Sequence, residues 1–455
     1  MLYQFFGGVH PAEHKDLSEH KATAPMAEQP AQVVIPMAMH IGAPCKPVVA
    51  KGDAVKVGQL IGVTTGLGAP IHASVSGTVA AVEPRPYGGG GMMMSVVIDN
   101  DFQDTPDPSI QHRENVDALT GAEIIEIVKN AGITGMGGAA FPTHVKLSGA
   151  VGKVDYVILN GAECEPYITS DHRLMLERGE AVIGGARLIA KAVGLREAHI
   201  GIELNKPDAI EHLTSLVGSA GDVHVLGLKT RYPQGAEKQL IQMITGRQVP
   251  PGRLPADVKC IVCNVATASA IWDAVTEGKP LTCRGVTLTG GAVAEPKNVM
   301  VPVGTPVSHL IKMAGGFKTD PDRVLYGGPM MGNPIYDLSV PMMKSTNCIL
   351  SLTKEEAAEQ DPAQTCIRCG KCVEACPMRL TPVFMRQYAE VRKWSEVEAL
   401  RVMDCIECGS CNYICPARLP LVQNFRTAKF AIRDAAMKAK AKAEAEAKAK
   451  EGAKA

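Results

Sequence analysis

The feature that most constrains this chain is one cysteine spacing that occurs twice near its C-terminal end. The segment CIRCGKCVEACP carries cysteines at 366, 369, 372 and 376, and CIECGSCNYICP carries them at 405, 408, 411 and 415. Two copies of C-x2-C-x2-C-x3-C-P are typical of a protein with two 4Fe-4S clusters, in which the fourth cysteine of each copy binds the other cluster. The spacing therefore predicts two ligand sets: Cys366, Cys369, Cys372 and Cys415 for one cluster, and Cys405, Cys408, Cys411 and Cys376 for its neighbour.

Zinc and disulfide bonds are the alternative uses of such cysteines. Zinc sites commonly combine two separated pairs of ligands around one ion, whereas each copy here brings four cysteines into eleven residues. Disulfides require a secretory route, and the first residues, MLYQFFGGVHPAEHKD, lack a basic region followed by an apolar core. Elsewhere, Cys260 and Cys263 form a C-x-x-C inside an apolar run, and we expect them to be buried thiols.

Length and charge limit the remaining classes of function. A chain of 455 residues is long enough for about three or four domains. Its net charge is zero and no basic stripe precedes the tail, so a nucleic-acid partner is not indicated. No apolar stretch approaches the ~20 residues needed to span a bilayer, so we expect any role at a membrane to be peripheral.

Residues 30–100 predict a small β-sandwich, because short apolar runs are separated there by glycine turns. The segments GDAVKVGQLIG and ASVSGTV resemble the barrel of biotinyl and lipoyl carrier domains, which carry their cofactor on a hairpin lysine. The corresponding turn, TTGLGAP, has no lysine. The resemblance therefore implies the fold without the swinging arm.

Residues 116–280 alternate between helical and strand patterns. Thr120 and Glu123 form a capping box that opens a helix, and DYVILN, AHIGIEL and VHVLGL are the expected strands. A long helix is expected through RLMLERGEAVIGGARLIAKAVG. This alternation predicts a mainly parallel sheet, with a ligand site beyond the carboxyl ends of its strands.

Two segments of this region carry residues suited to binding. GITGMGGAAFPTHVK offers glycines that permit close backbone approach and a lysine that adds positive charge: Gly135, Gly137, Gly138 and Lys146. NGAECEP crowds an amide and two carboxylates at the end of a strand: Asn160, Glu163 and Glu165. From the residues alone, an ordinary turn and a solvated acidic loop explain these segments equally well.

Taken together, G-x-G-G-x-x-F-P-x-x-x-K at 135–146 and N-x-x-E-x-E-P at 160–166 resemble the FMN- and NADH-binding subunit of respiratory complex I. The resemblance implies that the glycines and Lys146 contact noncovalently bound FMN, and that Glu163 helps to hold NADH. By the same likeness, YPQGAEKQL contributes Gly235 and Glu237, and CNVATAS contributes Asn264. The chain departs from the family pattern at three positions, Ala162, Ala236 and Cys263.

Residues 284–333 follow a strand, turn, strand and helix order, with Pro306 near the start of the helix. They resemble the soluble-ligand-binding β-grasp module of the same family, and we expect this module mostly to pack domains together. The predicted class is multidomain α/β: a carrier-like barrel-sandwich, a Rossmann-like FMN/NADH domain, a β-grasp module and an α-helical twin 4Fe-4S domain. We place these domains at 1–115, 116–280, 281–350 and 351–432, followed by an Ala/Lys/Glu-rich tail at 433–455.

This domain order resembles the RnfC family, which belongs to the Rnf ion-translocating electron-transport complex. The resemblance implies a peripheral protein on the cytoplasmic face of the bacterial inner membrane. It would pass electrons between NAD(H) and the integral and peripheral subunits of the complex, ultimately ferredoxin, through FMN and two 4Fe-4S clusters, with no side chain acting as acid or base.

Two other functions remain open at this point. The same modules suit a soluble flavin and iron-sulfur reductase, such as a corrin reductase, and they also suit an electron-relay scaffold without a catalytic flavin. The tail from Met437 is low in complexity, and its composition fits a fluctuating helix or a solvated segment.

Overall fold

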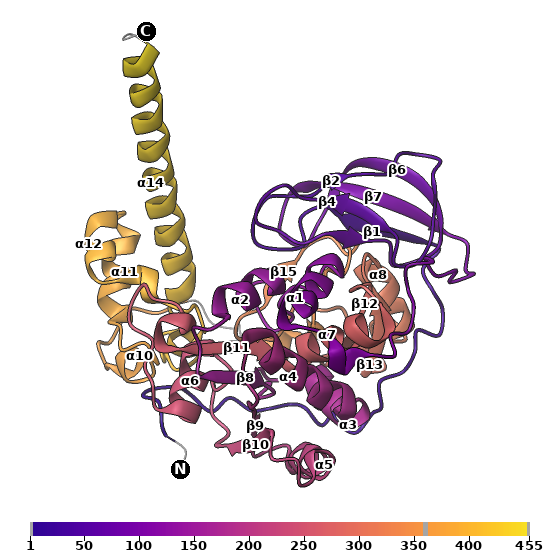
Figure 1. Ribbon diagram of the computed structural model, residues 1–455. Helices are drawn as coiled ribbons and strands as arrows, with labels where there is room; N and C mark the ends of the chain where they lie inside the picture. Colours follow the sequence, from indigo (N-terminus) through magenta and orange to yellow (C-terminus); the bar gives the residue numbers. More distant parts are fainter. Residues whose placement is uncertain (1–2, 358–362, 453–455) are drawn as a thin grey trace.

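The structure is a computed structural model in which residues 3–357 and 363–452 are described, and its modules follow one another along the chain (Figure 1). The first is a barrel-sandwich of two antiparallel sheets. One sheet has the order β1-β7-β6-β3, from β1 (Gln32–Pro36), β7 (Met92–Asn100), β6 (Gly77–Pro86) and β3 (Ala54–Val55). The other has the order β2-β4-β5, from β2 (Lys46–Pro47), β4 (Leu60–Val63) and β5 (Ile71–His72). The predicted β-sandwich is confirmed.

The second module is an α/β domain built on a four-stranded parallel sheet of order β10-β9-β8-β11. Its strands are β8 (Tyr156–Asn160), β9 (Ala198–Glu203), β10 (Val223–Leu228) and β11 (Cys260–Asn264). Its helices are α1 (Gly121–Asn130), α2 (Thr143–Ala150), α3 (Ser170–Glu177), α4 (Gly179–Val193), α5 (Pro207–Val217), α6 (Glu237–Thr245) and α7 (Val265–Glu277), with short 3-10 turns η1 (Val116–Ala118) and η2 (Pro255–Val258). The predicted parallel sheet is confirmed.

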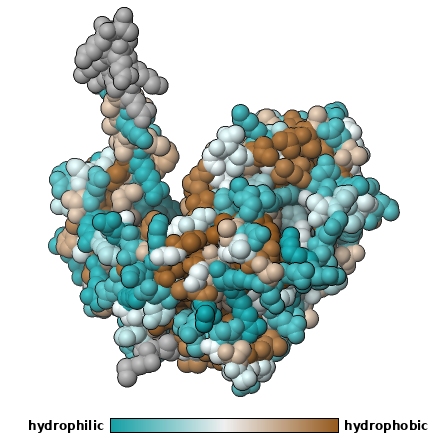
Figure 2. Space-filling view, in the orientation of Figure 1, coloured by the Kyte–Doolittle hydropathy of each residue, from teal (hydrophilic) through white to brown (hydrophobic). Residues whose placement is uncertain are grey.

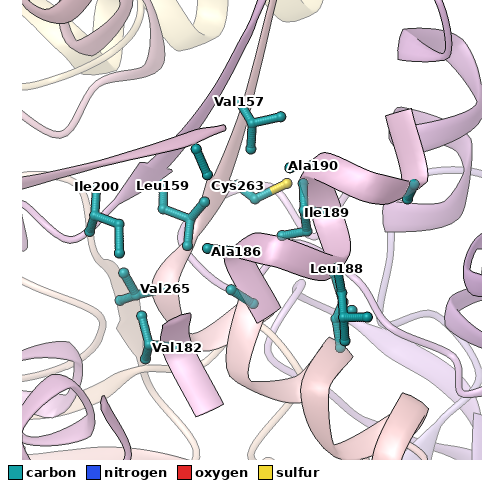
Figure 3. Close-up of a cluster of buried hydrophobic side chains, with 14 of the residues drawn as sticks. Val157, Leu159, Val182, Ala186, Leu188, Ile189, Ala190, Ile200, Cys263 and Val265 are labelled. Carbon is teal, nitrogen blue, oxygen red and sulfur yellow. The ribbon is translucent and has the colours of Figure 1, made fainter. Parts of the chain in front are cut away.

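Apolar side chains cover both faces of this sheet. On one face, Val157 and Leu159 of β8 pack against Ala186 and Ile189 of α4, as Figure 3 shows. On the other face, Ile158 belongs to a cluster that includes Leu240 and Ile241 of α6. Cys260 and Cys263 of β11 are buried among these groups, as expected for apolar thiols.

Helix α1 begins where its capping box places it, but a helix expected further along the chain is interrupted. Thr120 and Glu123 form the predicted capping box: the Thr120 N–H donates to Oε2 of Glu123 (2.7 Å), and the Glu123 N–H donates to Oγ1 of Thr120 (3.3 Å). The expected long helix is wrong, because it divides into α3 and α4 at Arg178 (φ −132°, ψ 35°). The Arg178 guanidinium pairs there with both carboxylate oxygens of Asp273 on α7 (2.9 and 2.5 Å). A tertiary ion pair and the weak helix propensity of the following Gly179 end the first helix.

The third module is a mixed five-stranded sheet of order β13-β12-β16-β14-β15. Its strands are β12 (Cys283–Thr289), β13 (Lys297–Pro302), β14 (Arg323–Tyr326), β15 (Asn333–Ile335) and β16 (Cys348–Leu352). Helix α8 (Val307–Met313) follows Pro306 as predicted, and α9 (Lys354–Ala357) follows the last strand. This sheet shares one hydrophobic core with the barrel, in which Val286 and Val299 lie in the same cluster as Ile35 and Ile98.

The fourth module is helical and ends in a long projecting helix. Its elements are α10 (Lys371–Glu374), α11 (Pro382–Glu390), α12 (Trp394–Ala399), η3 (Val402–Asp404), α13 (Ser410–Tyr413) and α14 (Leu421–Gly452). Met385, Val397 and Phe425 form its small core. Helix α14 extends away from the other modules, so the tail composition corresponds to a helix as far as the described chain reaches (Figure 1).

The visible surface mixes polar and apolar side chains (Figure 2). Apolar groups gather over the barrel and in the hollow between the barrel and the C-terminal lobe, while hydrophilic groups dominate elsewhere. Over residues 3–357 and 363–452, none of the helices combines the length and the apolar character that crossing a bilayer requires.

The N-terminal segment, residues 3–30, links three modules. The N–H of Gly8 donates to the carbonyl of Ala375 in the helical module (2.9 Å), and Val9 forms an antiparallel bridge with Tyr232 of the α/β domain. Further on, the Ala24 N–H donates to the carbonyl of Asn298 in the five-stranded sheet (2.9 Å). The segment therefore fixes the helical module against the α/β domain.

Candidate functional site

The eight motif cysteines line two separate cavities. Cys376, Cys405, Cys408 and Cys411 line the first, whose other walls include Met385, Val422 and Phe425. Cys366, Cys369, Cys372 and Cys415 line the second, whose rim includes Ile367 and Phe384. The structure thus brings together the same two sets of four that the crossed spacing predicts. We call them the inner set (376, 405, 408, 411) and the outer set (366, 369, 372, 415).

The electrostatics of the thiols follow the same grouping. The pKa of Cys405 is raised to about 11, mainly by burial and to a smaller extent by Cys408 and Cys376, against the opposing effects of the Glu407 N–H and Lys429. Burial also raises the pKa of Cys372, with Cys415 and Cys366 adding to the effect. Thiolates in such surroundings need a metal to stabilise them, because a coordinating thiol is deprotonated by the ion that binds it.

Backbone N–H groups point at sulfur in the inner set. The Glu407 N–H donates to Sγ of Cys405 and the Leu380 N–H donates to Sγ of Cys376, each at 3.4 Å. Hydrogen bonds to sulfur and exclusion of solvent are among the features that set the potential of an iron-sulfur cluster. The residues of this cavity therefore suit a 4Fe-4S cluster.

The inner set faces the α/β domain. Oη of Tyr232 donates to the carbonyl of Cys408 (2.7 Å), and Nε2 of Gln239 donates to the carbonyl of Pro377 (3.4 Å). Tyr232, Cys408 and Ala375 also share a small apolar cluster with Val9. In the outer set, by contrast, Cys369 is exposed.

The glycine loop, residues 132–138, precedes α2. The Gly135 N–H donates to the carbonyl of Phe141 (2.9 Å), and the Met136 N–H donates to Oγ1 of Thr267 (3.1 Å). A Cβ at Gly137 would come within 3.0 Å of the Asn264 side chain, whereas one at Gly138 would meet no atom within 4 Å. This is the open, close-approach backbone expected where a ligand lies against a loop.

Lys146 lies on α2 beside strand β11 and the first residue of α6. Its Nζ donates to Oε1 of Glu237 (2.7 Å) and to the carbonyl of Val262 (2.6 Å). Burial works against the charged amine, but Glu237 and Cys263 outweigh it and raise the pKa of Lys146. The lysine therefore stays cationic.

The predicted amides meet at the carboxyl edge of the parallel sheet. Asn160 of β8 and Asn264 of β11 are register partners, and Nδ2 of Asn264 donates to the carbonyl of Asn160 (3.4 Å). Nδ2 of Asn160 donates to the carbonyl of Gly235 (2.8 Å), while Nδ2 of Asn264 also donates to Asp171 (2.6 Å). The expected position beyond the strand ends is thus the position observed.

Glu163 and Glu165 are held by backbone donors and by partial burial. Glu163 accepts from the N–H groups of Asp171 (2.6 Å) and His172 (3.2 Å). Glu165 accepts from the N–H of Met330 (3.1 Å), and its Oε1 lies 3.3 Å from Oη of Tyr232. Burial raises the pKa of each carboxyl to about 7. Both therefore change charge near neutral pH.

Two buried lysines organise this acidic loop, and the sequence patterns did not single them out. Nζ of Lys15, in the N-terminal segment, donates to the carbonyls of Glu163 (3.0 Å), Glu165 (3.0 Å) and Ile168 (2.5 Å). Nζ of Lys206 donates to the carbonyl of Ala162 (2.8 Å). The only sequence signal was a lysine within HPAEHK, which has no periodicity to mark it as buried.

Comparison with known families assigns each module. Residues 3–103 match the RnfC barrel sandwich hybrid domain, and residues 128–273 match the Nuo51 FMN-binding domain. Residues 286–334 match the SLBB domain, and residues 365–419 match the 4Fe-4S dicluster domain. The module order read from the sequence agrees with these matches.

Three relatives resemble nearly the whole chain. The C subunit of the Na(+)-translocating ferredoxin:NAD(+) oxidoreductase complex of Acetobacterium woodii is 48% identical over 93% of this chain and 96% of its own length. The proton-translocating counterpart of Clostridium ljungdahlii is 46% identical, covering 97% of this chain and 96% of its own length. The C subunit of the ion-translocating oxidoreductase complex of Rhodobacter capsulatus is 45% identical, over 93% of this chain and 82% of its own length. By this similarity, and by its barrel-sandwich, FMN-binding, SLBB and 4Fe-4S dicluster domains, the chain belongs to the RnfC family, the C subunits of the ion-translocating oxidoreductase complexes.

Proposed function

We propose that this protein is the peripheral subunit through which an ion-translocating membrane complex exchanges electrons with NAD(H), with ferredoxin as the partner at the other end of the complex. The names of the relatives support this proposal. The observation that carries it is Tyr232, whose hydroxyl lies between Glu165 of the acidic loop (3.3 Å) and the carbonyl of Cys408 in the inner set (2.7 Å). One chain thus places an FMN-binding domain directly against a dicluster domain.

FMN would be held by the residues gathered at the sheet edge, with Glu163 and Glu165 helping to seat the nicotinamide nucleotide. The proposed FMN residues are Gly135, Gly137, Gly138, Lys146, Asn160, Gly235, Glu237 and Asn264. Bound FMN would supply the change from two-electron hydride chemistry to the one-electron chemistry of 4Fe-4S clusters, which no side chain supplies. The chain contributes close backbone approach at the glycines and a fixed positive charge at Lys146.

The inner and outer cysteine sets are the proposed cluster ligands. The inner set lies in an apolar enclosure beside the α/β domain, and the outer set includes the exposed Cys369. This arrangement orders the two sets from the flavin side toward the surface. A partner protein of the complex would therefore exchange electrons at the outer set.

The location that fits this role is the cytoplasmic face of the inner membrane, where NADH is available and the complex supplies the anchor. Family membership favours this role over the soluble corrin reductase and over the relay scaffold. Copurification of the tagged protein with integral membrane subunits is the expected result for the complex. A soluble reductase would purify without them.

The direct test is an NADH titration of the anaerobically reconstituted full-length protein. NADH should bleach the flavin absorbance, and the double variant Lys146→Met/Glu163→Gln should lose this response. Lys153→Met, an exposed lysine of the same domain, is the matched control and should respond like the unaltered protein. A flavin-loaded protein whose spectrum is unchanged by NADH would contradict the proposal.

A further inference from the structure

Two buried basic side chains of the five-stranded-sheet module reach into the glycine loop of the neighbouring α/β domain. We call this whole module, β12 to β16, the SLBB module, although both side chains lie outside its matched residues 286–334. Arg284 of β12 is 5% exposed, and its Nη1 donates to the carbonyl of Met136 (3.2 Å) and to the carbonyl of Lys344 (2.8 Å). Lys344 is 1% exposed, and its Nζ donates to the carbonyl of Gly132 (2.7 Å) and to that of Pro70 in the barrel (2.9 Å). Both ends of the loop are therefore held from another module.

Burial of these two basic groups is costly, because it lowers the pKa of Lys344 to about 7 and that of Arg284 to about 10, the latter against the charge of Asp171. Among the described residues, Nε of Arg284 has no hydrogen-bond partner, and Asp171 is the carboxylate whose charge acts on this guanidinium. Removing a charged group from water is unfavourable by several kcal/mol even after relaxation. Apolar side chains would pack the SLBB module against the α/β domain at a lower cost. The hydrogen bonds of Arg284 and Lys344 to the glycine loop therefore need an explanation of their own.

The hydrogen bonds of Met136 suggest what these contacts to the loop achieve. Thr267 accepts from the Met136 N–H (3.1 Å) while Arg284 donates to the Met136 carbonyl, so the residue is fixed on both sides. In a trans peptide the carbonyl of one residue and the N–H of the next point in opposite directions. Because the Met136 carbonyl points toward Arg284, the N–H of Gly137 points away from the Arg284 side chain. Among the described residues, no hydrogen bond uses the N–H of Gly137 or of Gly138.

We propose that Arg284 and Lys344 are positioning residues for FMN, and that the SLBB module is in this way part of the flavin site. They bind the carbonyls of Met136 and Gly132 on the side of the SLBB module. The N–H groups of Gly137 and Gly138 are then available to bind the anionic cofactor. Asp171 extends the same network, because it accepts from Asn264, whose side chain lies against Gly137. The module shares a core with the barrel, in line with the expected packing role, and the proposal adds a direct role at the flavin site. This inference rests on the proposed binding of FMN.

The test is the FMN dissociation constant of the anaerobic full-length protein, measured by quenching of flavin fluorescence. Arg284→Gln should weaken FMN binding by about tenfold or more, the range expected when a charged hydrogen bond is lost. Arg284→Lys keeps a charged donor and should recover part of the affinity. Lys297→Met is the matched control, because Lys297 of β13 donates to Met313 within its own module and should leave FMN binding unchanged.

If Arg284→Gln folds poorly, Thr267→Val provides a second variant in which to measure the FMN dissociation constant. It removes the other contact to Met136, and its effect on FMN affinity should combine less than additively with that of Arg284→Lys, since both act through one peptide. Iron content reports the clusters in every variant. FMN affinities equal to that of the unaltered protein in folded Arg284 variants would overturn the inference alone. An unaltered protein that binds no FMN would overturn both the inference and the proposed function.

Discussion

At the scale of single residues, the sequence was most informative where chemistry demands a fixed spacing. The cysteines, Lys146 and the strand-end amides could be predicted because their motifs carry the pattern. Lys15, Lys344 and Arg284 could not, because their importance comes from carbonyls far away in sequence. A buried lysine has no local signature, since the sequence around it looks like that around any surface lysine.

Lys15 offers a direct prediction. Lys15→Met leaves the carbonyls of Glu163, Glu165 and Ile168 without their donor, and unpaired buried acceptors are costly. We expect the free energy of unfolding to fall by about 3 kcal/mol, measured by anaerobic chemical denaturation. Lys21→Met is the control, because Lys21 also donates to one carbonyl, that of Pro296, but at an exposed position. Equal effects of the two substitutions would contradict the account of the acidic loop.

Glu163 predicts a pH dependence with a definite sign. Burial raises its pKa in the folded protein to about 7, from the value of 4.5 of an exposed glutamate. The folded state therefore binds more protons between these two values, so the stability that this carboxyl contributes is fully present below about pH 4.5 and is lost as the pH rises to about 7. Glu163→Gln should reduce this decline when denaturation midpoints are compared from pH 5 to pH 8. Parallel curves for the two proteins would show that the carboxyl does not titrate as described.

At the scale of elements, capping and periodicity predicted most helices and strands. They failed where tertiary contacts determine the end of a helix or the identity of a strand. The break at Arg178 depends on Asp273 of another helix, and β11 was read only as an apolar run until its pairing with β8 showed it to be a strand. The crossing of α4 and α7 is likewise decided by packing, because Gly185 lies against the backbone of Ala268.

This crossing predicts opposite outcomes for two glycine substitutions in helices. A Cβ at Gly185 would come within 2.0 Å of the Ala268 carbonyl oxygen, so Gly185→Ala should force α4 and α7 apart and cost about 1–3 kcal/mol or more. A Cβ at Gly149 of α2 would meet no atom within 4 Å. Gly149→Ala should therefore be neutral or stabilising by roughly 0.5–1 kcal/mol, through better helix propensity. Thermal or chemical denaturation of both variants checks the pair, and a stable Gly185→Ala protein would contradict the packing described.

At the scale of the whole molecule, the order of the modules could be predicted but their arrangement could not. Nothing in the motifs states that the N-terminal segment bridges the α/β domain and the helical module, or that the inner cysteine set faces Tyr232. These contacts arise from surfaces whose complementarity is distributed over many residues. They hold the four domains together, so that a route for electrons can run from the proposed flavin site through the inner cysteine set to the exposed outer set.

The measurement that tests this path most directly is cofactor analysis combined with electron paramagnetic resonance on one anaerobic sample of the full-length protein. The account predicts eight irons, eight acid-labile sulfides and one FMN per chain, following from two 4Fe-4S clusters and one flavin. It also predicts that dithionite produces the signals of two magnetically interacting reduced clusters. Zinc in place of iron, or the absence of a paramagnetic signal after reduction, would contradict it.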